Sequence, residues 1–188
     1  MNPSTILITG ANRGLGLKFA ELYAQKHFQV IATCRDIDSA DQLTSMAKRY
    51  SNIQILTLDV AQSESIQMLA DKLKGLPIDI LINNAGIWRS SSLGSVNKEA
   101  WLESFTTNTI APYEIACTFL PHIMDGVLKK VVSVTSKMGS IDDNTSGGSY
   151  IYRSSKSALN MVMRSLQHDL RSHGIATLTL HPGWVKTD

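Results

Sequence analysis

The chain has 188 residues, a formal net charge of +2 and an apolar share of 43%. This length predicts one domain, and this composition is typical of a folded globule and not of a disordered segment. The near-neutral charge argues against a nucleic-acid partner, and no apolar run reaches the roughly 18 residues that a membrane span needs. Neither Cys34 nor Cys117 has metal-ligand or disulfide-scaffold spacing, so we expect a cytoplasmic protein without a bound metal.

Short apolar, β-branched runs alternate along the chain with segments in which apolar residues recur at helical spacing. Strands are predicted, in chain order, at residues 4–9, 29–33, 53–58, 79–82, 130–134 and 175–180. Helices are predicted between them, at residues 15–26, 39–50, 63–74, 98–124 and 150–172. The fourth helix is expected to bend where Pro112 interrupts its hydrogen bonds. The first is expected to turn four residues inward: Leu15, Phe19, Leu22 and Tyr23.

Strands that are apolar on both faces and alternate with helices indicate an α/β fold with a parallel sheet covered on both sides. Right-handed crossovers then build a doubly wound sheet, whose ligand lies beyond the carboxyl ends of the strands. Functional residues are therefore expected directly after the strands.

A glycine-rich turn separates the first strand from the first helix. Gly10 allows the tight turn, Gly14 lets the backbone approach a pyrophosphate, and Gly16 lets the helix pack closely on the sheet. The helix start offers unpaired N–H groups and a partial positive charge to phosphate. This pattern, between a strand and an amphipathic helix, predicts a dinucleotide site, although a glycine triplet alone also occurs in ordinary turns.

Four motifs follow one another along nearly the whole chain: TGANRGLG at residues 9–16, NNAG at 83–86, YRSSK at 152–156 and PG at 182–183. In this order they resemble the compact branch of the short-chain dehydrogenase/reductase family. The resemblance implies a Rossmann fold and hydride transfer between NAD(P) and a small carbonyl or alcohol. Members of the family usually continue with another helix and strand. We therefore expect one domain over residues 1–188, incomplete at its C-terminal side.

The end of the second strand is expected to select the cofactor, since an acid there binds the ribose of NAD and a cation accepts the 2′-phosphate of NADP. By analogy with the family, the acid would fall at Cys34, which is not acidic. Arg35 follows it, and Arg13 adds a second cation whose planar donors suit phosphate. The prediction is NADP(H), with NAD(H) as the alternative because Asp36 either binds ribose or starts a turn.

Further cofactor contacts come from the resemblance alone. Asp59 and Val60 would lie beside the adenine, unless Asp59 only ends its strand. Others are expected in the glycine turn, after the fourth strand and after the sixth: Asn12, Leu15, Asn84, Ala85, Gly86, Pro182, Gly183 and Thr187.

Tyr152 and Lys156 are four residues apart on a predicted helix, which places them on nearly the same face. A free tyrosine has a pKa near about 10, and an ammonium about 4 Å away would lower it toward neutrality. Tyr152 is therefore the candidate acid/base, and Lys156 the charge that activates it and a ligand for ribose. An incidental pair on a surface helix is the alternative.

Two more catalytic residues come from the resemblance. The serine that orients the carbonyl falls at Ser136, with Ser133 and Ser140 as alternatives, and a proton-relay asparagine falls at Asn108, in a local bulge of its helix. Trp88 and Met138 are candidate walls of the substrate pocket, or else exposed loop residues.

The sequence thus predicts an NADP(H)-dependent oxidoreductase, similar to a carbonyl reductase, that acts on a small molecule. The alternative is an NADP(H)-binding sensor or signalling module with little turnover. By analogy with the family, the two long helices would pair subunits into a homodimer or homotetramer.

Overall fold

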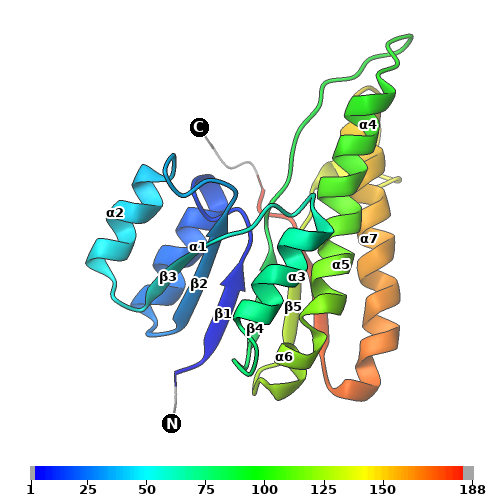
Figure 1. Cartoon of the computed structure of the whole chain (residues 1–188). Helices are drawn as coiled ribbons and strands as arrows, with labels where there is room; N and C mark the ends of the chain where they lie inside the picture. The colour runs from blue at the N-terminus through cyan, green and yellow to red at the C-terminus, as the bar shows by residue number, and fades with distance from the viewer. Residues whose placement is uncertain (1–2, 184–188) are drawn as a thin grey trace.

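The computed structural model describes residues 3–183 as a six-stranded sheet between two layers of helices (Figure 1). The strands are β1 (Thr5–Ile8), β2 (Gln29–Cys34), β3 (Ile53–Thr57), β4 (Ile80–Asn83), β5 (Lys130–Val134) and β6 (Ala176–Leu180). The helices are α1 (Gly14–Gln25), α2 (Asp41–Arg49), α3 (Ser63–Lys72), α4 (Lys98–Phe105), α5 (Ala111–Thr118), α6 (Leu120–Asp125) and α7 (Tyr150–Leu170). The predicted doubly wound α/β class is confirmed.

All neighbouring strands pair in parallel, in the order β3-β2-β1-β4-β5-β6. The chain builds outward from β1 to β3, and then returns to the other side of β1 to build β4, β5 and β6. The order therefore reverses between β1 and β4. In open α/β sheets a ligand binds beyond the carboxyl ends of the strands at this reversal.

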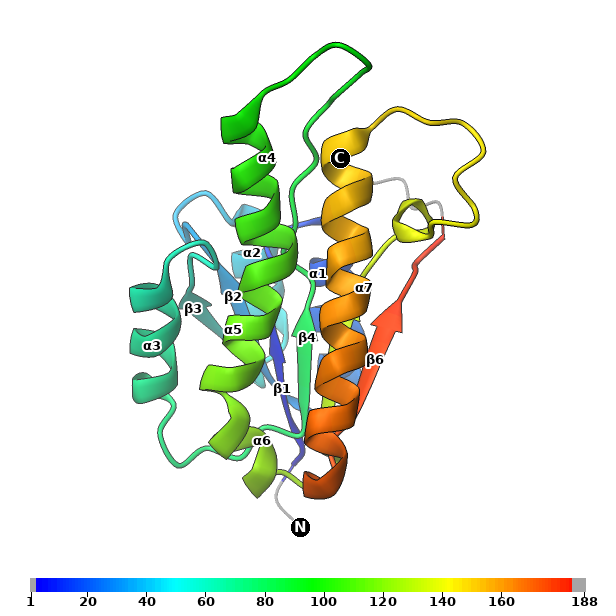
Figure 2. The same ribbon diagram turned by 90° about the vertical axis from the view of Figure 1, so that its right-hand side faces the viewer.

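Alternate strand residues enter different cores. Ile6 and Ile8 point into the core under α1 and α2, whereas Leu7 points into the core under α3, α5 and α7. The two helix layers are visible on opposite sides of the sheet in Figure 1, and Figure 2 looks onto the layer of α3, α5 and α7. Burial on both faces explains the unbroken apolar runs of these strands.

Helix α1 packs through small side chains. Gly16, Leu17, Ala20 and Ala24 are buried, so the helix lies closer to the sheet than the expected inward face would allow. The prediction for that face was wrong for Leu22, which is 46% exposed, while the other three expected residues pack at the margin of the core. The prediction was based on the large apolar residues of the helix, but close packing of a helix on a strand favours glycine and alanine.

The expected helix over residues 98–124 is divided into α4, a π-helical turn at Thr106–Ile110, α5 and α6. Pro112 lies in the first turn of α5 and lacks an N–H, so the hydrogen-bond ladder is already incomplete beside the π-helical turn. Such wide turns are frequent at functional sites. Here the turn holds Asn108 in a fully buried position.

Candidate active site

The glycine turn has the backbone that its residues suggest. Gly10 has a φ of +64°, and a Cβ added to it would lie 2.9 Å from the Cα of Ala85. A Cβ on Gly16 would collide with the carbonyl oxygen of Gly10 and lie 2.5 Å from Nδ2 of Asn84. Both positions therefore require glycine, one for conformation and close approach, the other for close approach alone.

Asn84 joins this turn to the end of β4. Its Nδ2 donates to the carbonyl oxygens of Thr9 and Gly10, each at 2.9 Å. In return, Oγ1 of Thr9 accepts from the backbone N–H groups of Asn84 and Ala85, both at 3.0 Å. The TGANRGLG and NNAG motifs, far apart in sequence, form one hydrogen-bonded unit at the strand reversal.

Helix α1 begins with its N–H groups available. Arg13 occupies its N-cap position without a side-chain cap, and the first turn contains no acid. These N–H groups and the positive end of the helix dipole can hold a phosphate. Asn12 is half-buried in the same turn, and Leu15 packs at the margin of the core.

At the end of β2, Cys34 is buried and Arg35 is exposed, as is Arg13. The carboxylate of Asp36 accepts from the backbone N–H of Asp38 at 3.0 Å. Hydrogen bonds from Ser39 and from that N–H lower the pKa of Asp36. Asp36 therefore stabilises the turn that leads into α2, which is the turn interpretation left open by the sequence.

Asp59 follows β3 and also forms a turn. Its Oδ1 accepts from the backbone N–H of Ala61 at 3.0 Å, and its own N–H donates to Oγ of Ser65 at 3.0 Å. Val60 is buried. Both residues lie at the carboxyl end of β3, on the same edge of the sheet as the glycine turn.

The side chain of Asn108 holds the backbone that follows NNAG. Its Oδ1 accepts from the N–H of Ile87 at 2.8 Å, and its Nδ2 donates to the carbonyl of Ile87 at 2.9 Å and to Oγ of Ser155 at 3.1 Å. A Cβ on Gly86 would lie 3.2 Å from Oδ1 of Asn108 and 3.6 Å from Nζ of Lys156. NNAG, the π-helical turn and α7 thus meet at one point.

Lys156 is 5% exposed and its Nζ donates to the carbonyl of Val134 at 2.9 Å. Burial lowers the pKa of this ammonium to about 8. The Nζ lies 5.8 Å from the centre of the Tyr152 ring. The helical spacing thus brings the two side chains together as expected.

The expected lowering of the tyrosine pKa by the ammonium is wrong for this geometry. Burial raises the pKa of Tyr152 above its ordinary value of 10, and a hydrogen bond with Ser136 only partly opposes this. Lys156 is desolvated and faces Val134, so it does not offset the desolvation of the phenol.

Among the three candidate serines, Ser136 is the one near enough to Tyr152 for its hydroxyl to lower the pKa of the phenol. Ser133 is fully buried and donates to Sδ of Met163 at 3.1 Å. Ser140 accepts from the backbone N–H of Asp143. Position directly after β5 was the signal that favoured Ser136.

Trp88 lies against the candidate acid/base. Its ring centre is 4.5 Å from that of Tyr152, with the planes inclined at 46°, and half of the residue is exposed. Arg89, next along the chain, makes a two-point ion pair with Glu103 at 2.7 and 2.8 Å. The indole is therefore half-exposed and lies beside the phenol ring. Met138 is half-buried in the 3₁₀ turn that follows Ser136.

The segment after β6 lies near the Ser136 turn, because Nδ1 of His181 accepts from the backbone N–H of Lys137 at 3.1 Å. Pro182 and Gly183 follow, and Gly183 has a φ of +74°. Thr187 lies outside the described residues.

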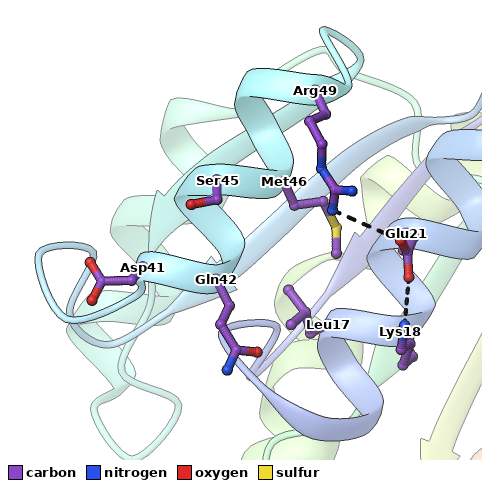
Figure 3. A pocket seen from close by; sticks show the side chains of 8 residues that line it. All are labelled: Leu17, Lys18, Glu21, Asp41, Gln42, Ser45, Met46 and Arg49. Atoms are coloured by element: carbon purple, nitrogen blue, oxygen red, sulfur yellow. Dashed lines mark hydrogen bonds and ion pairs between the residues drawn. The ribbon is translucent and has the colours of Figure 1, made fainter.

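A surface groove between α1 and α2 lies apart from these residues (Figure 3). Glu21 is central to its charges, with ion pairs to Lys18 at 2.8 Å and Arg49 at 3.9 Å. None of the predicted site residues lines it. Over residues 3–183, no group of three or more His, Cys, Asp or Glu side chains could hold a metal, and no helix there is long and apolar enough to cross a membrane.

A glycine turn at the strand reversal, together with a buried lysine and a tyrosine on the adjoining helix, defines a dinucleotide-binding Rossmann protein with a site of the oxidoreductase kind. The family model described as "short chain dehydrogenase" matches residues 4–188, and the chain belongs to this family of oxidoreductases.

Individual proteins are also similar to this chain in sequence or in structure. A 1-hydroxy-2-glutathionyl-2-methyl-3-butene dehydrogenase from Rhodococcus is 35% identical over 98% of this chain and 79% of its own. The C-signal protein of Myxococcus xanthus is 48% identical over 60% of this chain and 68% of its own. The solved structure of an NADPH-bound carbonyl reductase from chicken fatty liver is 37% identical, covers all of this chain and 82% of its own, and gives a TM-score of 0.93.

Proposed function

We propose that this protein is an NADP(H)-dependent reductase of small carbonyl compounds. The observation that carries the proposal is the Tyr152 phenol beside Ser136, with the buried Nζ of Lys156 one helical turn away and 5.8 Å from the centre of the ring. These groups stand at the carboxyl edge of the sheet, where the glycine turn offers a phosphate site. Bound nicotinamide would supply the hydride to the carbonyl carbon.

The cofactor would be held mainly by backbone. The glycine turn and the start of α1 would take the pyrophosphate, while Arg13 and Arg35 would take the 2′-phosphate. The turn role of Asp36 supports NADP(H) over NAD(H), because its carboxylate is already engaged with the backbone of Asp38. The NADPH-bound chicken reductase and a carbonyl reductase from Pseudomonas aeruginosa solved with NADP support the same choice.

The remaining predicted contacts belong to this proposal. Asp59 and Val60 would flank the adenine, and Asn84, Ala85 and Gly86 would line the cleft. Pro182, Gly183 and Thr187 would cover the carboxamide.

Tyr152 would protonate the alkoxide that forms when hydride reaches the carbonyl. Because its pKa is raised, the free phenol is protonated at neutral pH and so is present in the form that can donate a proton. Ser136 would hold the carbonyl oxygen beside the phenol. Lys156 would bind ribose, and the bulge at Asn108 would hold a water that returns a proton.

The indole of Trp88 would form one wall of the substrate pocket. It is held beside Tyr152 by the Ile87–Asn108 bonds on one side and the Arg89–Glu103 pair on the other. An apolar surface fixed next to the proton donor suits the uncharged part of a carbonyl compound.

The test is a panel of aldehydes and ketones with NADPH consumption followed by absorbance. At least one member should be reduced, and NADPH should bind more tightly than NADH in a fluorescence titration. Tight NADPH binding without turnover on any carbonyl would contradict the proposal and support the second candidate.

That second candidate is a nucleotide-binding signalling module. The 48% identity with the protein named C-signal favours it. The Ser136–Tyr152–Lys156 arrangement favours the enzyme, because nucleotide binding alone does not require a phenol with a serine and a lysine beside it.

Self-association and compartment are further parts of the proposal. Ile110, Tyr113 and Met161 are large exposed side chains on the layer that contains α5 and α7, which supports a homodimer or homotetramer through this face. Light scattering would measure it. Both cysteines are free, which supports a reducing, cytoplasmic location.

A further inference from the structure

Asn160 continues the line of Tyr152 and Lys156 along α7. Residues four apart advance about 6 Å and rotate about 400°, so the three side chains leave the helix on neighbouring parts of one face. Asn160 is half-buried, one turn beyond Lys156. Its side chain forms no hydrogen bond with the Tyr152 phenol or with the Lys156 ammonium. The proposed reaction gives it no role.

The amide of Asn160 binds both sides of the turn that carries Ser136. Its Oδ1 accepts from Oγ1 of Thr135 at 2.6 Å, and its Nδ2 donates to the carbonyl of Gly139 at 3.3 Å. Thr135 is the residue before Ser136, and Gly139 is three residues after it. Ser157 strengthens the second attachment with a 2.8 Å bond to the same carbonyl.

Gly139 shows how closely this turn lies on the helix. A Cβ added to it would lie 2.9 Å from backbone and side-chain carbons of Lys156 and 3.0 Å from Nδ2 of Asn160. Within the turn, Ser136 is held by its own local bonds, to the N–H groups of Met138 and Gly139. The turn is therefore internally ordered, and it is attached to α7 through Thr135 and Gly139 as well as to the segment after β6 through Lys137.

We propose that Asn160 is a positioning residue that sets the distance between the Ser136 hydroxyl and the Tyr152 phenol. The inference rests on the proposed function, because it assigns a catalytic consequence to that distance. Tyr152 and Asn160 lie on the same rigid helix, two turns apart. By binding the turn, Asn160 fixes the position of Ser136 relative to α7, the helix that carries Tyr152.

The amide is suited to this role because it offers an acceptor and a donor at once. An aspartate of the same shape keeps the bond from Thr135 but places a second oxygen against the Gly139 carbonyl. A leucine loses both bonds. Asn160→Asp therefore removes one of the two bonds between α7 and the turn, and Asn160→Leu removes both.

The experiment compares Asn160→Asp and Asn160→Leu with Asn52→Leu. Asn52 is a matched control, since its Nδ2 also binds two carbonyls, of Ala24 and Phe28, at 2.9 and 2.8 Å, on the far side of the molecule. We expect kcat to fall about 10–100-fold in Asn160→Leu and less in Asn160→Asp, since a shift of about 1 Å in a reacting group has effects of this size. KM for NADPH should be unchanged, and Asn52→Leu should lose stability without losing kcat.

A pH titration of the Tyr152 phenol by ultraviolet absorbance, with Tyr152→Phe as the blank, gives a readout that needs no turnover. The Ser136 hydrogen bond lowers the pKa of Tyr152, so its loss in Asn160→Leu should raise that pKa further. The same rise should occur in Ser136→Ala, and the double variant should add little to either.

Three results would overturn the proposal: an unchanged phenol titration in both Asn160 variants, a kcat loss equal to that of Asn52→Leu, or full additivity with Ser136→Ala. If Asn160→Leu does not fold, Asn160→Asp and Thr135→Val test the two attachments separately. A wild-type protein without carbonyl turnover would contradict the proposed function instead, while the titration would still decide the role of Asn160.

Discussion

The first three strands and the last three build their shares of the site by different means. Polar groups are nearly absent from the interior of the first part, where the buried ones are Thr5, Thr9 and Thr33. The second part buries many, from Asp79 to Lys156: Asp79, Asn83, Ser104, Thr107, Asn108, Thr109, His122, Ser133, Thr135, Ser155 and Lys156. One region presents backbone to a ligand, and the other presents side chains, most of them hydrogen-bonded, although those of Ser104 and His122 have no partner among the residues that the structure describes.

The difference follows from what each region would bind. A phosphate is satisfied by backbone N–H groups and a helix N-terminus, so glycines and a correct turn suffice. A proton transfer needs a side chain at a fixed place, and a buried polar side chain must be hydrogen-bonded to be stable there. The two regions should therefore respond differently to substitution.

Removing the phenol should give the largest effect, and only in the second region. Tyr152→Phe should reduce kcat by about 10²–10⁴-fold, because the proton donor is lost while the ring remains. The dissociation constant for NADPH should stay within about twofold, measured by fluorescence titration, because the phosphate site lies in the first region. Unchanged turnover would remove Tyr152 from the mechanism.

Lys156, in the second region, should make the free energy of unfolding of the protein depend on pH. Its pKa is about 8 in the folded protein and 10.5 ordinarily, so between these values the unfolded chain binds the proton and the folded chain does not. Stability should therefore rise with pH in this window, by up to about 3 kcal/mol relative to Lys156→Met. Urea unfolding at pH 7, 9 and about 10.5 measures this, with the exposed Lys72→Met as the control, which should follow the wild type.

Gly16→Ala should damage the first region alone. The added methyl collides with the Gly10 carbonyl and crowds the Asn84 amide, and overpacking of this kind costs about 1–3 kcal/mol. NADPH affinity should fall about tenfold, since about 1.4 kcal/mol in binding is a factor of ten. Gly75→Ala is the control: its φ of +79° is unfavourable for alanine, but it has open space around it and no link to the site. Equal losses of affinity in both variants would contradict the close-packing account.

Exchanging charge at the end of β2 should have the smallest effect, because Arg35 is exposed to solvent. Arg35→Asp should weaken NADPH binding and strengthen NADH binding, with each affinity changing less than about tenfold. The exposed Arg171→Asp is the matched charge control and should change neither. Equal affinity of the wild type for both nucleotides would contradict the assignment of Arg13 and Arg35.

The sequence predicted the first region more completely than the second. Glycine spacing and apolar strands are local signals, so the doubly wound fold, the turn at Gly10 and the close approach at Gly16 could be anticipated. The helical pair Tyr152–Lys156 was also a local signal. The prediction of the inward face of α1 was wrong for Leu22. The alanines that make the tight contact between helix and sheet are only weakly hydrophobic, so the sequence pattern did not single them out.

Features of the second region that depend on distant partners could not be read from spacing. The pKa of Tyr152 is raised because burial outweighs the Ser136 bond, and burial is a property of the assembled fold. Asn160 was missed, although its position four residues after Lys156 is a usable signal. The division of the helix was anticipated as a bend at Pro112 and, through the family resemblance, as a local bulge at Asn108, but the break between α5 and α6 was not anticipated.

The exchange of bonds between Thr9 and Asn84 has an evolutionary consequence. The hydroxyl and the amide satisfy each other's backbone, so a substitution that removes either polar group strands buried partners on the other segment. Replacing one side chain cannot compensate for losing the other, so both positions are expected to vary little among natural relatives.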